Sequence, residues 1–136
     1  SPLGMWARRQ AHETAVLRFD AENAFGAASH FDSEFSADGV DELLAAFAPR
    51  ASRFPVDEAR TMLVRTTDTD DLWHVTFTPD GISTVREDGP ADLTLSGSAQ
   101  DPYLAVWNRG DDSAISATGD LDLLETWHAN HRIRWS

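Results

Sequence analysis

The first part of the chain has the residue pattern of one long helix. Residues 5–24 contain no Pro or Gly and are rich in Ala, Arg, Glu and Leu, which favour helix. At helical spacing, Glu13 and Leu17 lie four residues apart on one stripe. His12 and Val16 lie on the adjacent stripe. Because the two stripes differ in character, we expect this helix to have two kinds of neighbour.

A connecting segment and a short helix come next. Residues 23–38 are dominated by Gly, Ser, Ala and scattered Phe, which is the composition of a linker. Asp38 is a suitable N-cap for a short helix that Pro49 ends. This helix has apolar residues at i, i+3, i+4 and i+7, namely Val40, Leu43, Leu44 and Phe47. We therefore expect one of its faces to enter the core.

Residues 60–96 have the pattern of four strands separated by turns. The turn signals are Asp68–Asp71, Pro79–Gly81 and Asp88–Pro90. Trp73 and Phe77 alternate with polar residues, and so they are expected on the buried face of a sheet. Leu93 and Leu95 alternate in the same way. The strands and their turns predict an antiparallel meander.

A second short helix follows the strands. Asp101 is its expected N-cap, and Pro102 suits its first position. It carries Leu104 and Trp107 on one face, and Gly110 ends it.

A short strand over residues 113–117 and a final helix opened by Gly119 and Asp120 complete the predicted elements. The order is helix, helix, four strands, helix, strand, helix, so the strands are grouped and the helices lie at the ends. This order favours an α+β fold. We expect a mostly antiparallel sheet of about five strands, covered by helices and preceded by one long helix.

Composition and charge narrow the classes of function. The 136 residues suit one domain, and the formal net charge of −12 disfavours binding to nucleic acid or to an anionic membrane. The sequence contains no Cys, which excludes disulfides, thiolate metal ligands and a Cys nucleophile. It has no secretory signal pattern and no apolar stretch long enough to span a membrane. We therefore expect a cytoplasmic protein.

Metal-binding and nucleophilic motifs are incomplete in this sequence. His12 is followed by Glu13, but the residue that would complete a helical i, i+4 pair with Glu13 is Leu17. His128 and His131 are three residues apart in the last predicted helix, with no third ligand spaced to join them. Neither a Gly-x-Ser-x-Gly motif nor a Gly-rich phosphate loop occurs.

Two further features are candidates for a binding role. Arg109 ends its predicted helix directly before Gly110, where its guanidinium can contact the last carbonyls of the helix or reach into a neighbouring cleft. Several apolar residues can either fill the core or line a ligand cavity between sheet and helices. These residues are Trp73, Phe77, Leu93, Leu95, Leu104 and Trp107.

Segments along most of the chain together resemble one bacterial protein family. They are residues 6–22, 38–44, 91–97, 107–109 and 118–120. The first, WARRQAHETAVLRFDAE, resembles the last helix of the metal-binding four-helix bundle in mycothiol-dependent maleylpyruvate isomerases and related thiol transferases. The others resemble the C-terminal domain of that family, which is similar in fold to sterol carrier proteins. The resemblance divides the chain into a bundle helix at residues 1–27 and a sterol carrier protein-like domain at residues 28–136. Residues 1–4 are either an addition ahead of Met5 or part of a longer natural chain, and the sequence leaves both open.

The resemblance implies zinc and mycothiol as cofactors of the family. The family's metal is held by a His early in the bundle and by a Glu-x-x-x-His pair on the last helix. Glu13 matches the Glu, Leu17 stands in place of the second His, and the earlier His would lie upstream of residue 1. Since one carboxylate holds zinc weakly, we expect no cofactor on this chain alone. The family's C-terminal domain also contributes an active-site Arg, for which Arg109 is the best match.

Three functions remain in competition. In the first, the chain is the C-terminal domain of a mycothiol-dependent isomerase or S-transferase-like protein, and it braces the bundle, presents Arg109 and is not catalytic alone. In the second, it is a binding module for a small apolar, lipid-like ligand. In the third, its first helix recruits a partner protein or a second copy. The expected partners are thus a helical-bundle domain or another copy of the chain, and a small thiol or apolar ligand.

Overall fold

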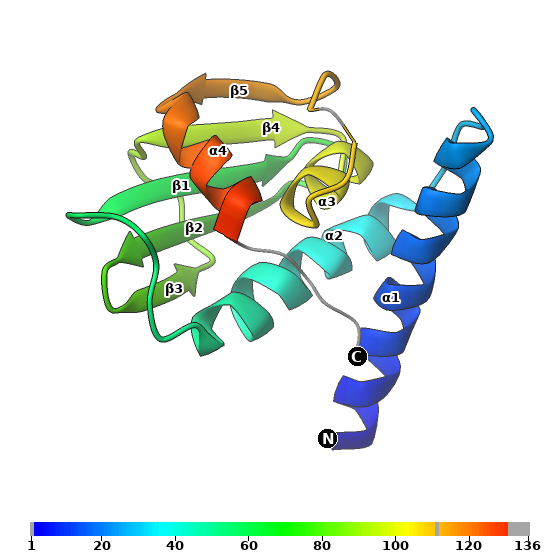
Figure 1. The fold of residues 1–136 in the computed structure, drawn as a ribbon, viewed down its shortest axis with the longest axis horizontal. Helices are drawn as coiled ribbons and strands as arrows, with labels where there is room; N and C mark the ends of the chain where they lie inside the picture. The colour runs from blue at the N-terminus through cyan, green and yellow to red at the C-terminus, as the bar shows by residue number, and fades with distance from the viewer. Residues whose placement is uncertain (1, 111, 131–136) are drawn as a thin grey trace.

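The computed structural model describes residues 2–110 and 112–130. In this part of the chain a five-stranded sheet has the order β3-β2-β1-β4-β5 (Figure 1). Its strands are β1 (Arg60–Thr66), β2 (Asp71–Thr78), β3 (Gly81–Val85), β4 (Leu93–Gly97) and β5 (Ser116–Gly119). The pairings β1–β2, β2–β3 and β4–β5 are antiparallel. A mostly antiparallel sheet of five strands is therefore confirmed.

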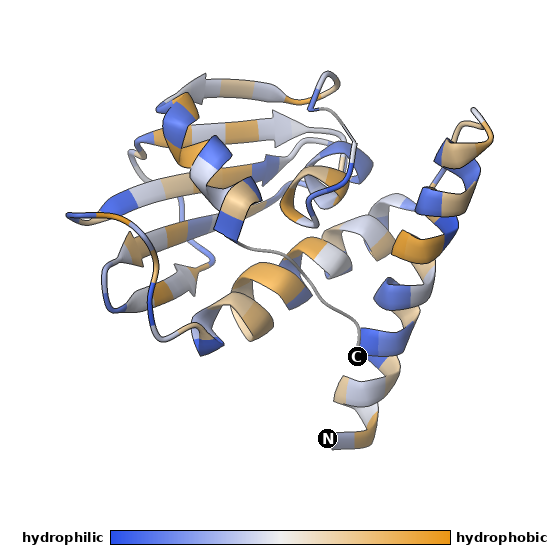
Figure 2. Cartoon of the chain, viewed as in Figure 1, coloured by the Kyte–Doolittle hydropathy of each residue, from blue (hydrophilic) through white to orange (hydrophobic). Residues whose placement is uncertain are grey.

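Helices cover one face of this sheet, and a long helix stands beside them (Figure 1). The covering elements are α2 (Ser33–Asp41), which continues as the π-helix η1 (Glu42–Phe47) and the 3-10 turn η2 (Ala48–Arg50), then α3 (Gln100–Val106) and α4 (Leu121–Asn130). The long helix α1 (Pro2–Ala24) precedes them. Figure 2 shows hydrophilic turns in the middle of α1 and a hydrophobic run along η1. The predicted α+β fold with one long leading helix is confirmed.

The position of β4 corrects the predicted meander. β4 lies parallel to β1, with Val64 opposite Leu95, on the side of β1 that faces away from β2. Alternating apolar residues indicate which face of a strand is buried, but they do not indicate which strand is its neighbour. A side-chain clamp marks the start of this pairing, since the Thr61 N–H donates to Asp92 Oδ2 at 2.8 Å and the Asp92 N–H donates to Thr61 Oγ1 at 3.0 Å.

The predicted linker contains the start of α2, so the expected cap at Asp38 is wrong. The N-cap is Asp32, whose Oδ2 accepts a hydrogen bond from the Phe35 N–H at 3.1 Å. Asp38 lies inside the helix instead. Ser33 and Ser36 made this stretch resemble a connection, but both lie within α2.

Two other boundaries differ from the expected ones. α3 has Ala99 rather than Asp101 at its N-cap, and the Ala99 N–H donates to Asp68 Oδ1 at 2.8 Å. β5 begins at Ser116, three residues later than the predicted strand. The start of α4 is as predicted, because Asp120 Oδ1 accepts from the Leu123 N–H at 3.3 Å.

Pro49 leaves one carbonyl of the π-helix η1 without a backbone donor. In the wider π turn, the Ala48 N–H donates to the Leu43 carbonyl. The corresponding donor for the Leu44 carbonyl would be residue 49, which is Pro and has no N–H. The hydroxyl of Thr84 on β3 supplies the missing hydrogen bond, with an Oγ1 to O distance of 2.6 Å. This bond joins the π segment to the edge of the sheet.

Replacing Thr84 with Val is expected to leave the Leu44 carbonyl without a donor while preserving the shape of the side chain. Because Leu44 is buried, the loss should lower the free energy of unfolding by about 1–3 kcal/mol. Urea denaturation followed by circular dichroism measures this change. Thr94→Val on β4, a half-exposed position, is the matched control and should change stability by less than about 0.5 kcal/mol. Equal effects of the two variants would show that the Thr84 hydroxyl is not needed.

Candidate functional site

A buried polar cluster joins α1 to the domain. His12 of α1 is fully buried, with Nε2 2.8 Å from Asp38 Oδ2 and Nδ1 3.0 Å from the hydroxyl of Tyr103. The imidazole also packs on the ring of Phe35, with 4.4 Å between centroids. We call His12, Asp38 and Tyr103 the His12 cluster. It brings together one side chain from each of α1, α2 and α3.

The protonation of this cluster follows from its hydrogen bonds. Burial alone would raise the pKa of Asp38, but hydrogen bonds from Arg8 and His12 outweigh it and lower that pKa below its usual range. Burial raises the pKa of the Tyr103 hydroxyl, which therefore remains an O–H donor. Because the Asp38 carboxylate can only accept, His12 donates to it from Nε2, and His12 Nδ1 shares the second hydrogen bond with the Tyr103 hydroxyl.

Arg8 extends the polar contact toward the sheet. Its guanidinium reaches Asp38 and Asp41 at 3.0 and 2.9 Å. Asp41 Oδ1 also accepts from the indole N–H of Trp73 on β2 at 3.0 Å. Burial opposes ionisation of Asp41, but the hydrogen bonds from Trp73 and Arg8 prevail and lower its pKa. The helix α1 is thus held to the sheet layer largely by charge and hydrogen bonds.

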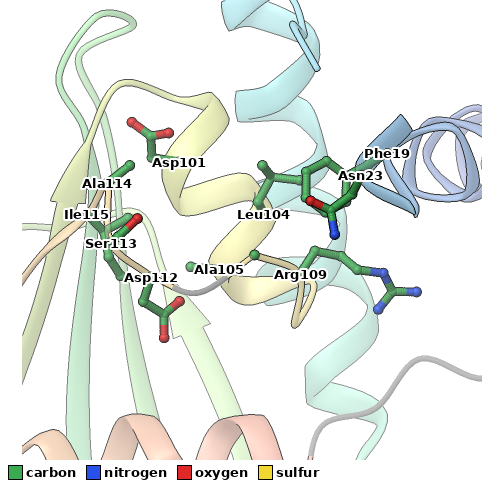
Figure 3. A pocket seen from close by; sticks show the side chains of 11 residues that line it. Phe19, Asn23, Asp101, Leu104, Ala105, Arg109, Asp112, Ser113, Ala114 and Ile115 are labelled. Carbon is green, nitrogen blue, oxygen red and sulfur yellow. The ribbon is translucent and has the colours of Figure 1, made fainter. Parts of the chain in front are cut away.

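A second feature is a groove of about 500 Å³ where the end of α1 meets α3 and the loop that follows α3 (Figure 3). Its lining mixes apolar and charged side chains, including Phe19, Asn23, Asp101, Leu104, Arg109, Asp112 and Ile115. Burial, with a smaller contribution from the charge of Asp68, raises the pKa of Asp101. We call this hollow the Arg109 groove.

Arg109 connects the two sides of this groove. Its Nε donates to Asp20 Oδ1 of α1 at 2.9 Å, and its Nη1 donates to the carbonyl of Trp107 at 3.2 Å. The flanking residues Asn108 and Gly110 have φ values of 61° and 74°, so the chain leaves α3 through a left-handed turn. In Figure 3 the Arg109 side chain extends beneath Asn23, away from Asp112. It contacts a carbonyl at the end of its own helix and also a carboxylate of α1.

The residues present do not fit a zinc ion. Glu13 is half-buried on α1, and its Oε2 accepts from Gln10 Nε2 at 3.5 Å. Leu17, which has no donor atom, is 51% exposed on the same helix. No group of three His, Cys, Asp or Glu side chains in residues 2–110 and 112–130 could hold a metal. His128 is paired with Asp112 at 2.8 Å, and His131 lies outside the described residues.

The six apolar pocket candidates do not share one cavity. Five of them are at most 1% exposed and belong to the packed core, namely Trp73, Phe77, Leu93, Leu95 and Trp107. Leu104 is half-exposed and lines the Arg109 groove. Trp73 also contributes to a different, acidic hollow beside Asp41 and Arg86. The structure therefore places these residues mainly as a core.

The His12 cluster is the part of the site that the sequence did not reveal. His12 and Tyr103 are 91 residues apart, and no local pattern relates them. The neighbour Glu13 drew attention to metal chemistry, whereas the structure uses His12 to hold α1 in place. One sequence feature does indicate that His12 faces the domain. It shares a helical stripe with the apolar Val16, and the structure buries both residues.

The fold and these contacts define an α+β domain with a five-stranded mixed sheet and an attached N-terminal helix. The sequence model of the MDMPI C-terminal domain family matches residues 34–126, and the chain belongs to this family. A solved structure described as "UbiJ-SCP2 Ubiquinone synthesis protein" is similar at 16% identity and a TM-score of 0.48, over 71% of this chain and 92% of that one. None of the curated proteins compared with the sequence matches it. Within the described residues, no helix has the length and apolar character needed to cross a bilayer.

Proposed function

We propose that this chain acts as the C-terminal, sterol carrier protein-like domain of a mycothiol-dependent isomerase or S-transferase-like protein. In this role it braces the last helix of a helical bundle and presents Arg109 to an anionic substrate or thiol. The observation that carries the proposal is the Arg109 groove, where a guanidinium contacts α1 through Asp20 beside a hollow of about 500 Å³. Family membership supports the same role.

The face of α1 that points away from the domain supports the bracing role. Leu3 and Leu17 are 77% and 51% exposed, and they lie on the same side of the helix. The opposite stripe is anchored through Arg8 and His12. Exposed apolar side chains at the two ends of the helix suit packing against further bundle helices or a second copy of the chain.

Arg109 would bind and orient an anion rather than transfer a proton. A guanidinium remains charged at neutral pH and offers two parallel N–H donors to a carboxylate. The Nε–H group of Arg109 already donates to Asp20. An incoming anion would therefore compete with Asp20 or bind the remaining N–H groups of the guanidinium. Catalysis by the chain alone is not proposed, because Glu13 supplies only one carboxylate where the family uses three metal ligands.

Replacing Arg109 with Ala is expected to change stability by no more than about 1 kcal/mol, because its ion pair with Asp20 is partly exposed. Turnover of the intact, metal-competent parent protein with mycothiol should instead fall by about a hundredfold, since a cationic partner of developing charge is lost. Arg109→Lys should rescue only part of the activity if the anion is bound by two parallel hydrogen bonds.

The control for this experiment is Asp20→Asn, which removes the ion pair and keeps the cation. It should retain turnover and can tighten anion binding, because Arg109 is then released from Asp20. Steady-state kinetics and calorimetric titration with mycothiol measure both effects. An unchanged kcat/KM in Arg109→Ala would remove Arg109 from the functional site.

A further inference from the structure

A separate pocket lies at the opposite end of α1 from Asp20, and the proposed role of Arg109 does not involve it. Its volume is about 270 Å³, and it is a partly open hollow between the first turns of α1 and the segment η1–η2. The lining residues include Met5, Trp6, Arg9, Glu42, Phe47 and Arg50. A cavity of about 150 Å³ is large enough for benzene, so this pocket can take an aromatic ring with two small substituents.

Glu42 supplies a buried polar group in this pocket. The residue is only 6% exposed, and its Oε1 atom is buried with no hydrogen-bond partner. Such an atom is uncommon in a folded protein, because an unmet hydrogen bond in the interior is costly. Burial raises the pKa of Glu42, while His12, Arg9 and Arg8 act against this rise and Asp38 adds to it. A ligand hydroxyl would give the carboxyl group the hydrogen bond that it lacks.

The backbone of this pocket is also unusual. Glu42 is the first residue of the π-helix η1, which also carries Phe47. Single π turns inside helices often occur at functional sites, since the wider turn changes the direction of the side chains. Here it places a buried carboxyl and an aromatic ring on the same side of one short segment.

The rim of the pocket carries positive charge. Arg50 is exposed at the basic end of η2. The guanidinium of Arg9 lies over the ring of Phe47, 4.1 Å from its centroid. Met5 and Trp6, which are 58% and 64% exposed, line the pocket on the side of α1. The pocket therefore combines a buried hydrogen-bond acceptor, apolar side chains and cationic groups.

We propose that this pocket binds a small aromatic carboxylate that carries a hydroxyl group at the end opposite its carboxylate. The hydroxyl donates to Glu42, the ring packs against Trp6 and Phe47, and the carboxylate faces Arg50. Each part of the ligand matches one observed feature of the pocket.

Three probes on the unmodified chain test this inference. 4-Hydroxyphenylacetate contains both groups, phenylacetate lacks the hydroxyl, and 4-methylphenol lacks the carboxylate. Titrations followed by NMR, with the indole signal of Trp6 as reporter, should show 4-hydroxyphenylacetate binding about tenfold more tightly than either of the others. Equal affinities, no binding at all, or shifts that leave Trp6 unaffected would overturn the proposal.

Variants then assign each end of the ligand. Glu42→Leu should lower the affinity for 4-hydroxyphenylacetate about tenfold and leave that for phenylacetate within about twofold. Arg50→Gln should weaken both carboxylates and leave 4-methylphenol unchanged, whereas Arg53→Gln, the exposed control, should have no effect. Unchanged binding in Glu42→Leu would overturn the proposal. If this variant does not fold, the three-probe comparison on the unmodified chain decides alone.

Discussion

Gly39→Ala is expected to destabilise the protein by about 3 kcal/mol or more, although it adds only one methyl group. The φ value of Gly39 is not the reason, since Gly39 is an ordinary residue of α2. A Cβ at this position would lie within 3.0 Å of Tyr103 Cδ1 and His12 Cε1 and still closer to Tyr103 Cε1. Both side chains are fully buried, so neither can move away without disturbing the core. Chemical denaturation followed by tryptophan fluorescence measures the loss.

Gly97→Ala is the matched control for this variant. The nearest atoms to a Cβ at Gly97 are 3.5 Å away, which is an ordinary contact. Its effect should be smaller than about 1 kcal/mol. A Gly39→Ala protein as stable as the Gly97→Ala protein would mean that α1 moves easily away from α2. The close approach at Gly39 would then be unimportant.

His12→Ala is the second substitution with a large expected effect. It removes a fully buried ring, leaves the Tyr103 hydroxyl without its partner and takes one hydrogen bond from Asp38. The cavity and the unpaired polar groups should together cost about 3 kcal/mol. Because the cluster joins α1 to the domain, we expect the amides near Val16 to lose protection from hydrogen exchange before those of β1 do.

His30→Ala provides the comparison, since His30 is exposed and only its backbone carbonyl takes part in a hydrogen bond, with Arg18. It should leave the free energy of unfolding within about 0.5 kcal/mol of the unsubstituted value. A similar result for His12→Ala, with α1 still protected, would show that the apolar contacts of Val16 hold the helix without the polar cluster.

The sequence predicted local structure better than it predicted neighbours. The alternation around Trp73 correctly identified the buried face of β2, and Asp120 correctly marked the start of α4. The parallel pairing of β4 with β1 was missed because a short apolar strand has the same pattern in either direction. The start of α2 was missed because Ser33 and Ser36 suggest a connection, whereas both are helical and Ser36 is fully buried against the core.

For the candidate site, too, the sequence indicated single residues better than contacts between distant parts of the chain. The sequence drew attention to Arg109 through its position before Gly110, and the structure adds that α1 supplies its carboxylate partner, Asp20. The contacts of His12 with Asp38 and Tyr103 depend on how three helices meet, and no spacing along the chain contains that information. The π turn at Glu42 was likewise not predicted, and the hydroxyl from β3 that bonds one of its carbonyls is 40 residues away along the chain.

The parallel placement of β4 also constrains the order in which the chain can fold. The β1–β2–β3 hairpins need only short turns and can close within microseconds. β4 pairs with β1 only after a far longer loop has closed, since its clamp joins Thr61 to a residue 31 positions away. During synthesis, β1 therefore has an unpaired edge until β4 has emerged from the ribosome. This interval is when the nascent chain is most exposed to pairing with other strands.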